Sequence, residues 1–210
     1  MPIVYRDVKG SALSYSELDG NFADLAARTA LSWSQIGGEP HVEEGTANAP
    51  SLETFRGGVD AWAYANGQMS QSFITFDVPF DYAVGTDLVV GIHWSPGSNA
   101  NTGNVRFGLE FTYAWSYGPG VNNVFGPTST IYMNASQADG TPYTSYLNFN
   151  DPADNFPAAA VQPNMRFLVR LFRDGGNVGD TFAAPIFIIG TDFFYQVDKF
   201  GTSTKAPPFV

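Results

Sequence analysis

The strongest constraint on the fold of this chain is a repeated alternation of apolar and polar residues. Its clearest run extends from Val105 to Trp115, where every odd-numbered residue is apolar or aromatic and the other face carries Arg106 and Glu110. Alternation with a period of two predicts a β-strand that buries one face. We therefore expect Arg106, Glu110 and, on a later strand, Arg170 to lie on a solvent face or near subunit contacts.

Seven further segments show the same kind of pattern, and turn-forming residues such as Pro96-Gly97 and Asp139-Gly140 separate them. Eight short strands with no helix between them predict an all-β fold, an eight-stranded antiparallel jelly-roll sandwich. The inward positions should include Val105, Phe107, Leu109, Phe111, Phe167, Val169 and Leu171. The expected strands are residues 59–65, 73–78, 88–94, 105–115, 129–133, 143–149, 166–172 and 184–197.

One α-helix precedes these strands, within residues 13–31. Ser14 and Glu17 have the spacing of a capping box, in which each side chain bonds a free backbone N–H of the first turn. An apolar seam follows with helical spacing, and a helix of about 17 residues is too short to be stable alone in water. The seam must pack on its own domain, on other copies of the chain or on another protein, and its expected anchor residues are Tyr15, Leu18, Phe22 and Leu25.

The chain therefore divides into three expected parts. Residues 1–33 form a helical anchor, and residues 59–210 form the sandwich. Between them, residues 34–58 contain Gly37-Gly38, Pro40 and Gly57-Gly58 without periodicity, which predicts an extended arm or linker.

Composition excludes several classes of function. A net charge of −10 is the opposite of what binding to nucleic acid or to an anionic membrane requires. The chain contains no cysteine, so disulfides and thiolate chemistry are absent. We also expect neither a secretory leader nor a membrane span, because the start lacks an apolar stretch and no apolar run reaches 18 residues.

The sequence offers little chemistry for catalysis or for holding a cofactor. His93 is expected on a polar or intersubunit sheet face, and the segment His41-Val42-Glu43-Glu44 matches no metal motif. The loop from Asp174 to Asp180 lacks the alternating acids of an EF-hand, so it is expected to be a hairpin rather than a calcium site. We expect no catalytic residue, no metal and no cofactor.

Two aromatic residues, Trp115 and Tyr117, end the strongest strand at a Gly-Pro-Gly turn. Exposed aromatic rings at this position could stack on sugar rings. They could equally fill an interface or cap the sandwich. Both residues are therefore candidates for ligand or interface contacts.

The run Leu13-Ser14-Tyr15-Ser16-Glu17-Leu18-Asp19-Gly20-Asn21-Phe22 resembles an N-terminal helical element of tailed-bacteriophage virion proteins. The segments 91–94, 101–110, 192–196 and 201–209 are similar to those of trimeric jelly-roll proteins of phage particles. The resemblance implies a location in the virion, assembly as a homotrimer, and attachment to capsid or tail proteins through residues 1–58. No heptad run or β-helix repeat provides a fibre shaft, which favours a compact protein of the head.

Two classes of function follow from these expectations. The first is a non-catalytic, homotrimeric capsid decoration or cement protein. The alternative is a receptor-binding tip or short fibre of the tail that binds host surface glycans. No motif favours an enzyme.

Overall fold

The computed structural model describes residues 12–28, 31–43, 45–115, 124–137, 140–150, 156 and 160–197, and for residues 23–28 only the backbone. Within these residues, the elements are one helix followed by ten strands. In chain order they are α2 (Tyr15–Arg28), β1 (Ser32–Gly38), β2 (Ser51–Arg56), β3 (Val59–Tyr64), β4 (Met69–Asp77), β5 (Val89–Ser95), β6 (Gly103–Trp115), β7 (Ser129–Gln137), β8 (Tyr146–Phe149), β9 (Met165–Asp174) and β10 (Ile186–Val197).

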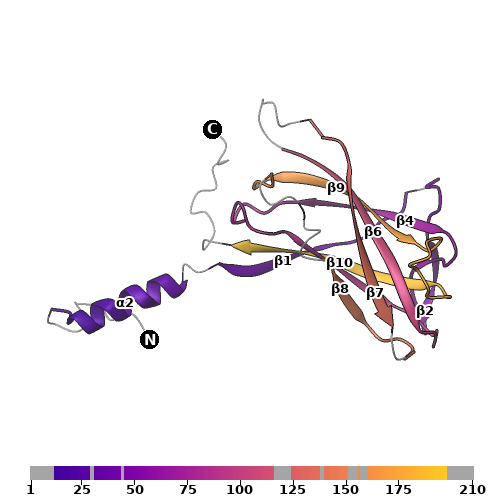
Figure 1. The fold of residues 1–210 in the computed structure, drawn as a ribbon, viewed down its shortest axis with the longest axis horizontal. Coiled ribbons are helices and arrows are strands. Elements are labelled where there is room, and N and C mark those ends of the chain that lie inside the picture. The colour runs from indigo at the N-terminus through magenta and orange to yellow at the C-terminus, as the bar shows by residue number, and fades with distance from the viewer. Residues whose placement is uncertain are drawn as a thin grey trace.

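The strands form two antiparallel sheets that pack face to face (Figure 1). A six-stranded sheet has the order β2-β3-β10-β5-β8, with β1 also paired to β10, and a four-stranded sheet has the order β4-β9-β6-β7. The pairing is nested, because β3 pairs with β10, β4 with β9, β5 with β8 and β6 with β7. A long hairpin folded over itself in this way is a jelly roll, and all eight predicted strands are confirmed.

The predicted register is also confirmed. The inward residues of β6 and β9 are almost completely buried, and they meet the inward face of the six-stranded sheet in one core. Phe107 and Phe167 are typical, each fully shielded from solvent. Burying a side chain of this size contributes about 1.5–3 kcal/mol, so a shift of one residue would expose the whole apolar set.

Residues 34–58 differ from the expected arm. β1 pairs with β10 over its whole length, and β2 forms a hairpin with β3 through Gly57 and Gly58. Gly38 shows why the sequence misleads here. A Cβ at this residue would lie 2.8–2.9 Å from side-chain atoms of Ile74, Phe193 and Thr191, so the glycine permits close packing instead of marking a linker. The sandwich thus begins near residue 32 rather than 59.

Helix α2 begins as predicted. The Ser14 backbone N–H donates to Glu17 Oε2 at 2.8 Å, and the Glu17 N–H donates to Ser14 Oγ at 3.3 Å. The helix lies apart from both sheets (Figure 1). Among its described seam residues, Tyr15 is 90% exposed and Phe22 is 63% exposed, so the sandwich does not cover them.

A buried arginine joins the two sheets at one end of the core. The Arg173 guanidinium is fully buried and makes paired bonds of 2.9 and 2.7 Å to the carboxylate of Asp180. It also donates to the backbone carbonyls of Tyr64, Phe182 and Ala184. These bonds connect β9 to β3 and to the segment that leads into β10.

Candidate functional site: an aromatic hollow at one end of the sandwich

The candidate site lies where β6 extends beyond the core. Phe111 is the last fully buried inward residue of this strand, and its ring lies 4.3 Å from that of Phe156. The next two residues of the same face, Tyr113 and Trp115, continue past this layer. Tyr113 stacks on Phe167 with ring centroids 4.9 Å apart, and Trp115 is 38% exposed.

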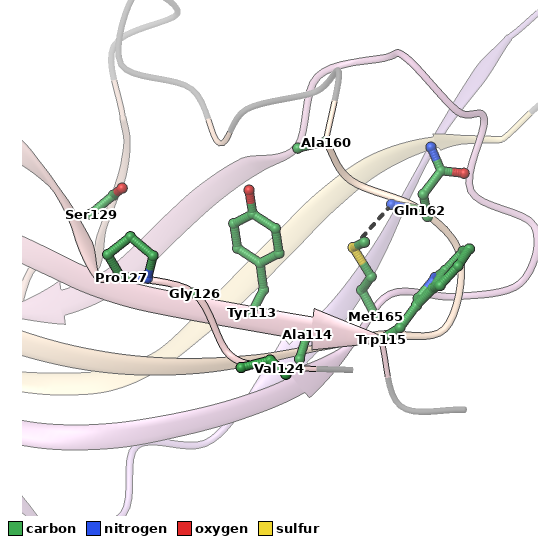
Figure 2. Close-up of a pocket in the computed structure, with 10 residues that line it drawn as sticks. All are labelled: Tyr113, Ala114, Trp115, Val124, Gly126, Pro127, Ser129, Ala160, Gln162 and Met165. Atoms are coloured by element: carbon green, nitrogen blue, oxygen red, sulfur yellow. Dashed lines mark hydrogen bonds between the residues drawn. The ribbon is translucent and has the colours of Figure 1, made fainter. Parts of the chain in front are cut away.

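These two aromatic residues line a hollow of about 650 Å³, which we call the Trp115 hollow. Figure 2 shows their rings on either side of Met165, whose sulfur accepts the backbone N–H of Gln162 at 3.4 Å. The opposite wall comes from the segment that leads into β7. Among the described residues the lining is Tyr113, Ala114, Trp115, Val124, Gly126, Pro127, Ser129, Ala160, Gln162 and Met165.

The lining determines what chemistry the hollow can perform. It contains aromatic faces, a phenol, a serine hydroxyl, a glutamine amide and backbone groups. None of the ten described lining residues is Asp, Glu, His, Lys or Arg, so these ten side chains offer neither a carboxylate nor an imidazole for acid–base catalysis. The arrangement is suited to binding an uncharged molecule that has apolar faces and hydroxyl groups.

The structure separates the residues that the sequence singled out. Trp115 lines the hollow, whereas Tyr117 lies outside the described residues. Tyr15, Leu18 and Phe22 lie on α2 and take no part in the hollow. Leu25 belongs to the same helix, but its side chain is not among those described.

Of the ten lining residues, the sequence singled out only Trp115, and Tyr113 and Gln162 are the most informative of those it missed. Tyr113 could have been found, because it lies on the same face of the same strand as Trp115. No pattern in the sequence points to Gln162. It reaches the hollow because β9 pairs with β6, which places Met165 opposite Trp115 and brings the nearby Gln162 with it. Tertiary structure alone brings this segment to the site.

The other polar candidates lie apart from the hollow and from one another. His93 lies on the outer face of the six-stranded sheet, where its Nε2 is 2.7 Å from Asp192 Oδ2. His41 pairs through its backbone with Phe73, and Glu44 lies outside the described residues. No group of three or more His, Asp or Glu side chains that could hold a metal occurs within the described ranges.

The Asp174–Asp180 loop uses its acids within the fold. Asp174 pairs with Arg106 at 3.3 Å, and Asp180 pairs with the buried Arg173. The outer face of the four-stranded sheet also holds the ion pair of Arg170 with Glu110, at 2.6 Å. Arg106, Glu110 and Arg170 therefore lie outside the core, as predicted, and pair across strands. No helix in the part of the chain that the structure describes is long and apolar enough to cross a membrane.

Comparisons with known proteins find distant likenesses in structure alone. No protein-family model matches the chain, and no curated protein matches it. Among solved structures, a carbohydrate-binding module specific for non-crystalline cellulose, CBM28, is 15% identical over 77% of this chain and 86% of its own, with a TM-score of 0.33. The xylan-binding module CBM15 is 12% identical over 79% and 97%, with a TM-score of 0.32. TmCBM61, solved with β-1,4-galactotriose, is 11% identical over 80% and 88%, with a TM-score of 0.29. At these scores the assignment of the fold depends on the strand pairing of the chain itself.

Proposed function

We propose that this protein is a non-catalytic glycan-binding module of a phage particle and that it holds neutral saccharides in the Trp115 hollow. The observation that carries the proposal is the lining, two aromatic side chains beside uncharged hydrogen-bonding groups in a hollow of about 650 Å³. This volume is within the usual range of small-molecule sites. The C–H faces of a sugar ring pack on aromatic rings, and its hydroxyls bond to amide, hydroxyl and backbone groups.

The charge distribution favours uncharged sugars over acidic ones. The chain carries a net charge of −10, and no lysine or arginine is among the described residues that line the hollow. A uronic or sialic acid would therefore find no cation to pair with its carboxylate. The resemblance of residues 13–22 to a virion element supports a location on a phage, where such a module would be the receptor-binding tip of a tail protein.

Binding of the full-length chain to an array of neutral and acidic glycans tests this proposal. We expect binding to neutral glycans, and Trp115→Ala should weaken it about tenfold or more in calorimetric titration, whereas Trp115→Phe retains most of it. Gly126→Leu should also block the hollow, because a Cβ at Gly126 meets no atom within 4 Å and leaves room for the larger side chain. Val178→Ala, at the opposite end of the sandwich, is the control. Glycan binding that is unchanged in both hollow variants would place the site elsewhere.

A second candidate function, a homotrimeric capsid decoration or cement protein, is favoured by the exposed seam of α2. Tyr15, Leu18 and Phe22 are exposed apolar residues on a short helix that does not pack on its own sandwich. Three copies attached through such seams would gain avidity without any new contact.

Substitution in the seam tests this candidate. Phe22→Glu in the full-length chain should abolish trimers in sedimentation and incorporation into particles, whereas Ser16→Glu on the same helix should preserve both. A stable monomer of the unmodified chain at micromolar concentration would refute the trimer. Incorporation of the Phe22→Glu variant at full occupancy would refute the role of the seam.

A further inference from the structure

The outer face of the six-stranded sheet carries a second group of residues that the hollow does not use. Strand pairing places Gly37 of β1, Asp192 of β10, Gly91 of β5 and Phe149 of β8 side by side in one row. Because paired residues of antiparallel strands point to the same face, all four face outward. His93 lies in the next row, between Gly190 and Leu147.

The centre of this face is a partly buried polar pair. His93 Nε2 and Asp192 Oδ2 are 2.7 Å apart, and the side chains are 33% and 18% exposed. The bond uses one ring nitrogen and one carboxylate oxygen. The other nitrogen of His93 and Asp192 Oδ1 take no part in it, so the pair offers a fixed set of hydrogen-bonding groups to a ligand.

Two glycines leave the floor beside this pair open. A Cβ at Gly190 would meet no atom within 4 Å, and a Cβ at Gly37 would meet only Asp192 Oδ1, at 3.9 Å. Neither glycine has a positive φ, so turn geometry does not require them. Because neither glycine has a side chain, the Asp192 carboxylate stays accessible from the side of β1, where Gly37 lies, and from the side of Gly190 on its own strand, β10.

Apolar side chains form a wall on the other side. Leu147, Phe149 and Phe194 lean over Gly91, where an added Cβ would lie 2.8–3.3 Å from atoms of all three. The rings of Phe149 and Phe194 meet edge to face with centroids 5.3 Å apart. Phe149 and Leu147 are both exposed, so the wall is available to a ligand.

We propose that the strip formed by Gly37, Gly190, His93, Asp192, Phe149 and Phe194 is a second binding site for neutral saccharide chains. A polar pair between an open floor and an aromatic wall matches a sugar, which presents hydroxyls at its edge and C–H groups on its faces. Another protein surface fits less well, because it would bury the His93–Asp192 pair at a desolvation cost. An anionic ligand would meet the carboxylate. The ligand class follows the proposed function, but the location is independent of the hollow.

Glycine amide signals in two-dimensional ¹H–¹⁵N NMR of the full-length chain can test the two sites separately. The probes are cellotriose and galactotriose at millimolar concentration. We expect the amides of Gly37 and Gly190 to shift with saturation, and Gly126 to report on the hollow. Gly58, in the β2–β3 turn, should not move.

Substitutions then assign the response. Gly190→Leu should fill the open floor and weaken binding at the strip at least tenfold without changing the Gly126 response, and Asp192→Asn should also weaken it. Gly58→Leu, where an added Cβ also meets no atom within 4 Å, is the matched control.

If Gly126 alone responds, the strip is not a site although the proposed function stands. If Gly37 and Gly190 alone respond, the strip stands and the hollow does not. A response at neither place, or a change of sedimentation in Gly190→Leu that shows a subunit contact, overturns the inference.

Discussion

Replacing Arg173 by methionine should destabilise the sandwich more than almost any other single change of a polar residue. Arg173 is fully buried, and its partner Asp180 is buried with it at 1% side-chain exposure. Methionine fills much of the same volume but leaves the carboxylate without its charge partner. It also removes the donor from the carbonyls of Tyr64, Phe182 and Ala184.

The size of the effect follows from these contacts. Removing one partner of a buried ion pair costs about 3–5 kcal/mol, because the remaining charge stays buried. In a chain of this length, a change of that size lowers the melting temperature by about 6–20 °C. The carbonyls add to the loss wherever water cannot reach them.

Urea unfolding of the full-length chain measures the free energy directly. Arg166→Met is the control on the same strand, because Arg166 and Asp77 form an exposed pair with both side chains 49% accessible, and such pairs contribute little. The double variant Arg173→Met with Asp180→Leu should be less destabilised than the sum of the two single variants, since no charge then remains buried. Unfolding of Arg173→Met within error of the unmodified chain would refute the view that this pair holds the two sheets together.

Three further outcomes are expected. Phe107→Ala should lower the free energy of unfolding by about 3–5 kcal/mol, and an unchanged melting curve would contradict the core register. In thermal melts, Gly38→Ala should cost about 1–3 kcal/mol through overpacking, whereas Gly37→Ala at the next residue should be nearly neutral, and equal effects would contradict the proposed packing. Burial raises the pKa of the Tyr64 phenol well above its usual value, so the folded chain disfavours the ionised form. Tyr64 should therefore contribute a loss of about 1.4 kcal/mol of stability for each pH unit above about 10. Denaturant titrations should show a shallower loss in Tyr64→Phe than in the unmodified chain, because Tyr82 and Tyr195, whose pKa values are also raised, remain in the variant.

Local patterns in the sequence determine much of this protein. The alternation along β6 and β9 defines which residues enter the core, because side chains of a strand point to opposite faces in turn. The Ser14–Glu17 capping box fixes the start of α2 for a similar reason, since both partners lie within one helical turn. Eight strands, each with one face marked as apolar by the order of its residues, are enough to favour a jelly roll.

Only the tertiary structure determines which residues of segments that are distant in the sequence come into contact. β1 and β2 are strands because they pair with β10 and β3, and their glycines look like a linker until Ile74 and Phe193 are seen to pack against Gly38. The Trp115 hollow needs Gln162 and Met165. The strip on the outer face of the six-stranded sheet needs His93 beside Asp192, which is 99 positions away in the sequence. The order of residues along a strand shows which side chains point to the core, because that property is local. The order of the strands in each sheet, and the contacts between neighbouring strands, depend on how the whole core packs. The residues that would bind a ligand are brought together by that second, non-local step.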